Sequence, residues 1–274
     1  MDAPAREQPH NHQVVMSRFV AACQADTRVV AAFLGGSYAR GTADAYSDLD
    51  LGLITTDAAY EDFYTGREAF IRQLGEPLFL EDFDSAVTVF FILADGTEGE
   101  LAVGRESRFQ HIHGGPYKVL LDKKHLLPGV VFPWHTPAAA EQIETLRCLI
   151  YWFWHDLSHF IAAMGRGQLW WAYGQLEALR RICVNLARLR QHFAAAADGY
   201  EKVEQALPEE QLASLQATCC ALEQEAMLRA ALVIMRFYQE VAPLLAQTHG
   251  IPYPADLAQV MAERLEKLCA ARLR

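Results

Sequence analysis

The sequence lacks the features of several large protein classes. Its six cysteines include no Cys-x-x-Cys pair, and its most apolar region, residues 148–164, is interrupted by His155, Asp156 and His159. That region falls short of the roughly 18–20 uninterrupted apolar residues that a membrane-spanning helix needs. The first residues, MDAPAREQPHNHQVV, lack the basic start and apolar run of a signal peptide. These absences predict a cytoplasmic protein with reduced thiols and no membrane partner.

Basic residues are also scarce. Lysine and arginine total 24 against 34 aspartate and glutamate residues, for a formal net charge of -10. Proteins that grip phosphate backbones usually show the opposite balance or a clear basic stripe, so we expect no nucleic-acid partner. The 274 residues are 52% hydrophobic and 21% charged, which is typical of an ordinary globular protein and excludes a disordered or fibrous chain.

The chain divides into two halves of different texture. Up to about residue 132, short apolar runs alternate with turn residues, which predicts strands at 29–35, 49–54, 85–94, 99–104 and 118–121. Residues 58–75 have helical spacing of their apolar side chains. This order of elements predicts a mixed α/β domain over residues 1–134.

The second half, residues 135–274, follows a proline-rich loop at 125–137 and is predicted to be an all-α domain. Sparse glycines and prolines divide it into four or five helices, which favours a bundle. We expect the aromatic cluster at 151–154 and 170–173 to lie mostly in its core. His155 and His159 lie one helical turn apart, but no third ligand is evident, so a surface pair is favoured over a metal site.

Chemistry is concentrated in residues 35–54, GGSYARGTADAYSDLDLGLI. A strand ends at a Gly-Gly-Ser turn, and Asp48-Leu49-Asp50 then enters the next strand. Side chains alternate along a strand, so Asp48 and Asp50 point the same way and repel each other unless a cation joins them. Paired carboxylates suit Mg²⁺. The turn at Gly36-Ser37 offers amide groups, a hydroxyl and a helix N-terminus to an anion.

The pattern Gly-Ser-x10-Asp-x-Asp, formed by Gly36, Ser37, Asp48 and Asp50 and flanked by Arg40-Gly41, resembles the signature of the DNA polymerase β-like nucleotidyltransferase superfamily. A helical half after such a domain resembles the antibiotic nucleotidyltransferases, which modify aminoglycosides or lincosamides. The resemblance in motif covers only the first half. The second half resembles these enzymes in architecture alone, and acceptor binding or dimerisation is its implied role.

The resemblance implies a third carboxylate on a later strand. Glu98 and Glu100 are the candidates, and Glu100 is favoured because Leu101, Ala102 and Val103 follow it as an apolar strand. Relatives often have aspartate at this position. The alternative for both glutamates is an exposed hairpin face.

The resemblance also implies the reaction: a nucleoside monophosphate, AMP from ATP by analogy, is transferred to an acceptor hydroxyl and pyrophosphate is released. Asp48 and Asp50 would hold two Mg²⁺ ions against the triphosphate, and Gly36, Ser37 and Arg40 would bind the nucleotide. Glu100 would complete the second metal site or act as general base.

Acids gather between residues 57 and 100, where a cleft would attract a polycationic acceptor. Glu81, Asp82, Asp84 and Glu98 are the candidates for contacting it, and a solvated acidic face is the alternative. Two other functions stay open: a nucleotidyltransferase that modifies a protein side chain, and a catalytically silent nucleotide-binding regulatory module. A homodimer through the helical half is a further possibility.

Overall fold

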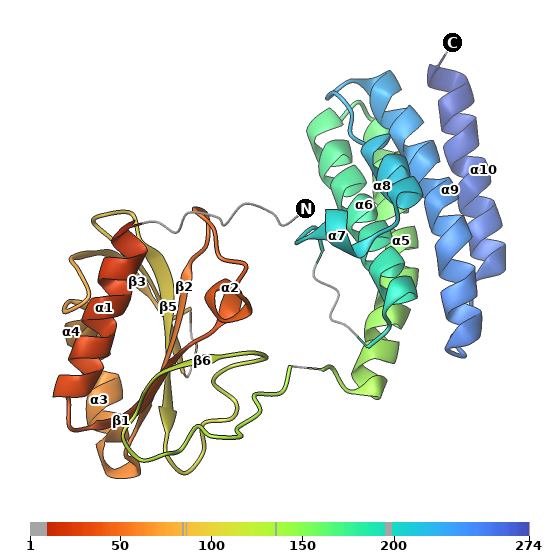
Figure 1. Ribbon diagram of the computed structural model, residues 1–274. Helices are drawn as coiled ribbons and strands as arrows, with labels where there is room; N and C mark the ends of the chain where they lie inside the picture. The colour runs from red at the N-terminus through yellow and green to blue at the C-terminus, as the bar shows by residue number, and fades with distance from the viewer. Residues whose placement is uncertain (1–9, 84, 86, 135, 195–198, 274) are drawn as a thin grey trace, which may run out of the picture. The chain divides into compact units, whose positions relative to one another are not determined.

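Figure 1 shows the computed structural model, which describes residues 10–83, 85, 87–134, 136–194 and 199–273. The chain forms two compact units, Met1–His135 and Thr136–Arg274. We call them the N-terminal unit and the C-terminal unit, and each is described by itself.

A six-stranded sheet with the order β3-β4-β5-β2-β1-β6 is the framework of the N-terminal unit. The strands are β1 (Val29–Leu34), β2 (Leu49–Thr55), β3 (Pro77–Glu81), β4 (Thr88–Leu93), β5 (Glu98–Arg105) and β6 (Lys118–Asp122). Strands β2 and β5 pair in parallel, and every other neighbouring pair is antiparallel. The sheet is therefore mixed, which confirms the predicted α/β fold class of this half.

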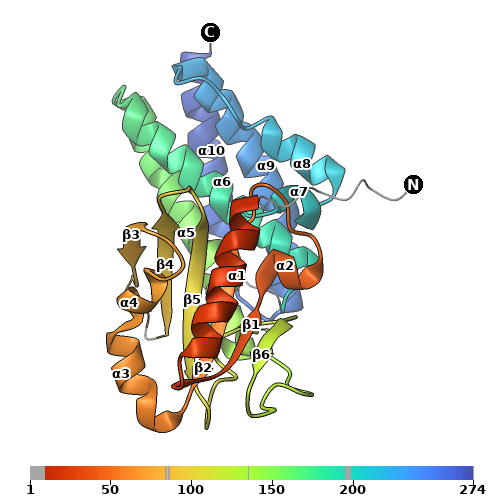
Figure 2. The ribbon, with the colours of Figure 1, turned by 60° about the vertical axis from the view of Figure 1, so that its left-hand side comes forward.

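Three helices cover one face of this sheet, and Figure 2 shows α1 running along it. The helices of the unit are α1 (His10–Ala25), α2 (Gly36–Arg40), α3 (Tyr60–Thr65) and α4 (Arg67–Ile71), with a short 3-10 turn at Asp57–Ala59. The covered face buries β1, β2, β4 and β5 side chains against α1, α3 and α4. A smaller apolar cluster on the other face involves the segments between β5 and the end of the unit.

Two details of this unit differ from the sequence prediction. Strand β3 was not predicted, because it starts with Pro77 at the edge of the sheet and its side chains are half-buried or exposed without alternation. The single helix expected over residues 58–75 is divided at Gly66 into α3 and α4.

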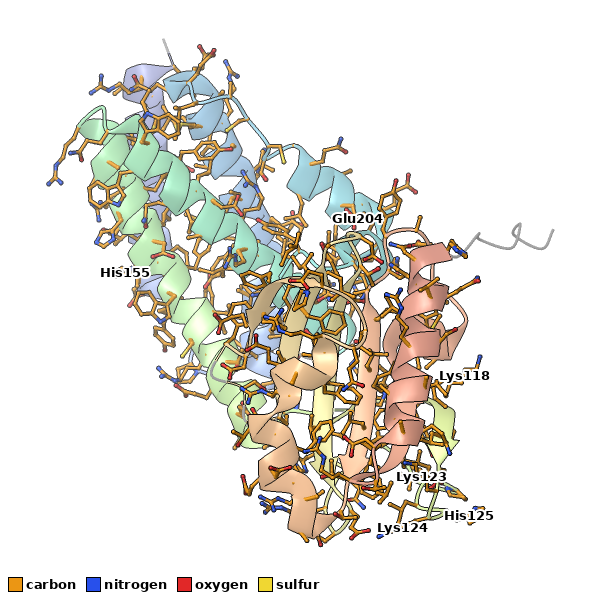
Figure 3. All side chains as sticks on the ribbon, turned by 90° about the vertical axis from the view of Figure 1, so that its left-hand side faces the viewer. Lys118, Lys123, Lys124, His125, His155 and Glu204 are labelled. Atoms are coloured by element: carbon orange, nitrogen blue, oxygen red, sulfur yellow. The ribbon has the colours of Figure 1, made fainter. Side chains whose placement is uncertain are left out.

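Two lysines that follow β6 contact other segments of the N-terminal unit. The ammonium group of Lys123 donates to the carbonyl oxygens of Cys23 at 2.8 Å and Asp26 at 2.9 Å, at the end of α1. Lys124 pairs with Glu106. Figure 3 labels both lysines at this end of the unit. These cations therefore have structural partners.

The C-terminal unit contains only helices among its described residues, which confirms the predicted all-α class. They are α5 (Ala139–Gly165), α6 (Leu169–Gln191), α7 (Val203–Ala206), α8 (Glu209–Gln216), α9 (Gln224–Thr248) and α10 (Ala255–Arg272). The long helices share one apolar core, in which the Tyr238 ring stacks on Phe153 with centroids 3.6 Å apart. The Tyr238 hydroxyl donates to the carbonyl oxygen of Ile150 at 2.8 Å. No described helix is long and apolar enough to cross a membrane.

The aromatic cluster of this unit is less buried than the sequence suggested. Phe153 and Trp154 lie in the core, but Trp152 and Trp170 are 53% and 80% exposed. Trp171 is 40% exposed. Consecutive residues of a helix point in different directions, so only part of such a run can face one core. The expectation that this cluster is mostly core is therefore wrong.

Candidate active site

Strands β2 and β5 place two of the predicted carboxylates side by side. Asp50 and Glu100 are paired residues of the parallel ladder. Neighbouring strands lie about 4.8 Å apart, and side chains of paired residues point to the same face. Leu49, Leu51 and Leu101 are buried on the helix-covered face. The alternation of each strand therefore directs Asp50 and Glu100 to the opposite face.

Asp48 lies immediately before β2 and is exposed. The pKa of Glu100 is raised, first by burial of its carboxyl group and then by the negative charges of Asp50 and Asp48. The pairing register places Asp50 beside Glu100, and Asp48 is near enough for its charge to act on Glu100. Three negative charges in one place repel one another until a cation joins them.

This repulsion predicts that Glu100 limits the stability of the metal-free protein. The pKa of Glu100 is higher in the folded chain, so its stabilising contribution is full below the unfolded pKa and is lost as the pH rises through the folded pKa. Without Mg²⁺ at neutral pH, we expect Glu100→Gln to raise the melting temperature by roughly 1–3 °C, a small effect because the carboxyl is partly exposed. The gain should vanish on acidification. Thermal melts across this pH range test it.

Glu98→Gln is the matched control, because Glu98 lies on the same strand and face but is paired with Ile92 of β4. Its substitution should change the melting temperature less. A Glu100→Gln protein that is less stable than wild type at neutral pH would contradict the repulsion.

The Gly-Gly-Ser turn lies directly against the carboxylate of Asp50. A Cβ atom on Gly36 would lie 1.5 Å from Oδ2 of Asp50, and the φ of Gly36 is +54°. The amide of Gly35 donates to the carbonyl oxygen of Asp50 at 2.8 Å. Only glycine at position 36 therefore allows the turn and Asp50 to approach this closely. The thirteen residues between Gly36 and Asp50 fold back so that the two ends of the motif meet.

Ser37 carries a buried hydroxyl oxygen that has no hydrogen-bond partner among the described residues. Buried polar atoms are normally paired, so an unpaired one invites a ligand. Ser37 is the second residue of the helix α2, whose first turn leaves its amide groups without acceptors inside the helix. The five residues of α2 make its dipole small, so the individual amide groups would provide the anion binding. Arg40, in the last turn of α2, is exposed.

A pocket of about 60 Å³ on the same face is lined by Asp50, Glu100, Thr88 and His113, among others. Its volume suits an ion with a few waters but not a whole nucleotide. The motif did not single out His113, which lies in the segment between β5 and β6. Nothing in the sequence near residue 113 marks it, because it reaches the pocket through the tertiary fold.

His12 is a second residue that the sequence reasoning missed. It is buried at the start of α1, and its Nδ1 lies 2.6 Å from the hydroxyl of Tyr38 on α2. Burial lowers the pKa of His12, while the charges of Asp95 and Asp48 oppose that effect. The hydrogen bond between His12 and Tyr38 ties α2 to α1.

The predicted acceptor-binding acids lie in different places. Glu98 lies on the face of β5 that carries Glu100. Glu81 shares a row with Glu100 through Phe90, but its carboxylate accepts from the amides of Asp82 and Phe83. Asp82 pairs with Arg67 at 2.8 Å. Asp84 lies outside the described residues.

Several acids of the 57–100 segment are partly neutralised by arginines. The ion pairs are Asp62 with Arg28, Glu61 with Arg105, Asp82 with Arg67, and both Glu68 and Glu76 with Arg72. The segment is therefore less negative in the fold than its composition suggests.

The side chains of this site fit Mg²⁺ that is bound jointly by protein carboxylates, water and phosphate oxygens. Within the described residues, no three histidine, cysteine, aspartate or glutamate side chains are grouped closely enough to hold a metal by themselves. Mg²⁺ usually takes one or two carboxylates and completes its octahedron with water and phosphate oxygens. Asp48 and Asp50 beside the unpaired Ser37 hydroxyl match that division of ligands. On α5, the rings of His155 (Figure 3) and His159 have centroids 4.2 Å apart and also belong to no such group in the described chain.

Two solved structures resemble the chain distantly. An aminoglycoside 6-adenyltransferase from Bacillus subtilis is 14% identical, with a TM-score of 0.45, and the match covers 92% of this chain and 97% of that one. A STING-associated CdnE c-di-GMP synthase from Capnocytophaga granulosa is 12% identical, with a TM-score of 0.29 and coverage of 85% and 81%. Similarities this low carry no conclusion about this chain. No curated protein sequence matches it.

The family model gives a far stronger result. The model of streptomycin adenylyltransferase matches residues 10–268, which include the Gly-Ser turn, all three carboxylates and nearly all of the helical unit. The match extends well beyond the motif that first suggested a nucleotidyltransferase. The chain therefore belongs to the streptomycin adenylyltransferase family and is a nucleotidyltransferase.

Proposed function

We propose that this protein transfers AMP from ATP to a hydroxyl group of an aminoglycoside antibiotic of the streptomycin type and releases pyrophosphate. The observation that carries the proposal is the pairing of Asp50 with Glu100 on parallel strands, with Gly36 packed against the Asp50 carboxylate. This arrangement puts metal-binding oxygens and a phosphate-binding turn at one point. The family match supports the same chemistry.

Each residue of the site has a separate task in this reaction. Asp48 and Asp50 would hold Mg²⁺, which neutralises the triphosphate and the developing charge on the leaving group. The amide groups of the Gly36-Ser37 turn and the Ser37 hydroxyl bind outer phosphate oxygens, and Arg40 adds a positive charge at the end of α2. The hydrogen bond from the Gly35 amide to the Asp50 carbonyl oxygen holds the turn next to Asp50.

Glu100 is suited to receive the proton of the attacking hydroxyl. The acceptor oxygen forms a bond to the α-phosphorus as the bond from that phosphorus to the β-phosphate bridging oxygen breaks. Pyrophosphate leaves with that electron pair, and the hydroxyl proton passes to the carboxylate of Glu100. Burial and the adjacent aspartates raise the pKa of Glu100, and a higher pKa makes a carboxylate a better base.

A cationic antibiotic suits the acids near this site. Glu98 lies on the same face as Glu100, and Glu81 lies in the same row of the sheet two strands away. Both can attract guanidinium or ammonium groups of an acceptor. Asp82 is the weaker candidate because Arg67 already pairs with it.

The test is a panel assay with ATP and Mg²⁺. Streptomycin, spectinomycin, other aminoglycosides and lincomycin are incubated with the protein, and pyrophosphate release and product mass are measured. We expect release with an aminoglycoside and a product heavier by one adenylyl group. If the protein binds ATP but releases no pyrophosphate with any of these acceptors, an antibiotic is rejected as the acceptor. A protein acceptor or a regulatory module would then be favoured. We also propose that the helical unit binds the acceptor or forms a dimer. The proposed location of the protein is the cytoplasm.

A further inference from the structure

The segment between β5 and β6 carries two histidines, His111 and His113, and only the second is packed against the active-site turn. A Cβ atom on Gly35 would lie 2.5 Å from Cε1 and 3.0 Å from Nδ1 of His113. The imidazole therefore rests directly on the backbone of Gly35. His111 instead lines a different pocket, together with Tyr60, Arg105 and Arg108.

The His113 ring is held in a fixed orientation. Its Nε2 lies 2.9 Å from the carbonyl oxygen of Pro116. A carbonyl can only accept, so Nε2 carries the proton and donates. The rings of Phe33 and Phe132 flank the imidazole with centroid distances of 5.4 Å and 5.2 Å. One hydrogen bond and two aromatic contacts leave the ring little freedom to turn away from Gly35.

A short chain of contacts connects this ring to the catalytic carboxylate. His113 packs against Gly35, the Gly35 amide donates to the Asp50 carbonyl oxygen, and Gly36 packs against the Asp50 carboxylate. His113 also lines the small pocket that contains Asp50 and Glu100. The segment between β5 and β6 thereby contacts the turn that also packs against Asp50.

Position 35 requires glycine because space is limited there and not because of its backbone conformation. Its φ of -100° and ψ of -155° are open to any residue, so the conformation itself does not require glycine. The three atoms nearest to a Cβ at this position all belong to the His113 ring. Gly36 is different, because its φ is positive and Asp50 occupies the space of a side chain.

We propose that His113 is a positioning residue that holds the Gly35-Gly36 turn in the geometry that binds the triphosphate of the nucleotide. This inference rests on the proposed function, because it concerns the same nucleotide site. Gly35 and His113 depend on each other, because the absence of a side chain on Gly35 leaves room for the His113 ring.

The test compares wild type with His113→Ala, Gly35→Ala and the double variant, and uses His111→Ala as the matched control. Calorimetry measures the Kd for ATP with Mg²⁺, and steady-state kinetics separate the KM for ATP from the KM for the acceptor. We expect each single variant to weaken ATP binding about 10-fold, as loss of an orienting neighbour does at other sites. The KM for the acceptor should stay unchanged, and His111→Ala should bind ATP like wild type.

The double variant gives the sharpest result. Removal of the ring makes room for the Cβ at position 35, so the double variant should bind ATP no more weakly than His113→Ala alone. The inference would be overturned if the losses of ATP affinity in the two single variants multiplied in the double variant, or if His113→Ala bound ATP like wild type. Either result would leave the proposed function intact. A wild-type protein that binds no ATP in the presence of Mg²⁺ would reject the proposed function, and the inference with it.

Discussion

The Asp50→Asn variant should lose at least about 1000-fold in kcat while keeping its fold. The amide is nearly isosteric with the carboxylate, so the packing against Gly36 is retained, but the charge that holds Mg²⁺ is lost. Metal stabilisation of a phosphoryl transition state contributes several kcal/mol, and each 1.4 kcal/mol corresponds to a factor of ten. Pyrophosphate release under saturating ATP and acceptor measures the effect.

Stability distinguishes this loss from unfolding. Asp50 is one of the charges that raise the pKa of Glu100, so its neutralisation removes repulsion. The melting temperature without Mg²⁺ should therefore be at least as high as that of wild type. Glu68→Gln is the matched control, because Glu68 forms an exposed ion pair with Arg72 on α4 and should be dispensable for turnover. A fully active Asp50→Asn protein would refute the assignment.

The Gly36→Ala variant should lose both activity and stability. A left-handed φ costs a non-glycine residue about 1–2 kcal/mol, and the added methyl group would in addition collide with the Asp50 carboxylate. We expect kcat/KM for ATP to fall at least about 100-fold, since displacing Asp50 by an ångström disturbs the geometry of the reaction. Steady-state kinetics together with chemical denaturation measure both effects.

Gly41→Ala separates the two causes. Gly41 follows α2 with a φ of +70°, but no atom lies within 4 Å of the space that its Cβ would occupy. It therefore bears the backbone strain without the collision. Gly41→Ala should lose only the stability that the backbone strain costs, less than Gly36→Ala loses, and little activity. Equal losses of activity in the two variants would show that strain in the turn, and not the approach to Asp50, explains the effect.

The strands and most of the site could be predicted because local signals determine them. Val29–Leu34 is buried at every position, and a continuous apolar run indicates such a strand. The alternation in Asp48-Leu49-Asp50 predicts that Asp50 points away from the face of Leu49, and Leu49 is buried on the helix-covered face. The family resemblance, which places the third acid in an apolar strand, favours Glu100 over Glu98, and Glu100 pairs with Asp50 in the ladder.

The remaining features depend on contacts between distant parts of the chain. Strand β3 begins at Pro77 and has a short apolar run without alternation, much of it exposed at the sheet edge, so its sequence does not distinguish it from a loop. His12 reaches Tyr38 across 26 residues, and His113 reaches Gly35 from the segment between β5 and β6. The ion pair between Arg67 and Asp82 is likewise invisible in the composition of the acidic segment. Tertiary packing, not local pattern, determines these contacts.

The most direct test of the central claim follows the label of ATP into the acceptor. The protein is incubated with Mg²⁺ and streptomycin, in parallel with ATP labelled at the α-phosphate and with ATP labelled at the γ-phosphate. The account predicts that α-label enters the antibiotic and that all γ-label appears in pyrophosphate, with both lost in Asp50→Asn. Transfer of γ-label to the antibiotic would identify a kinase and contradict adenylyl transfer.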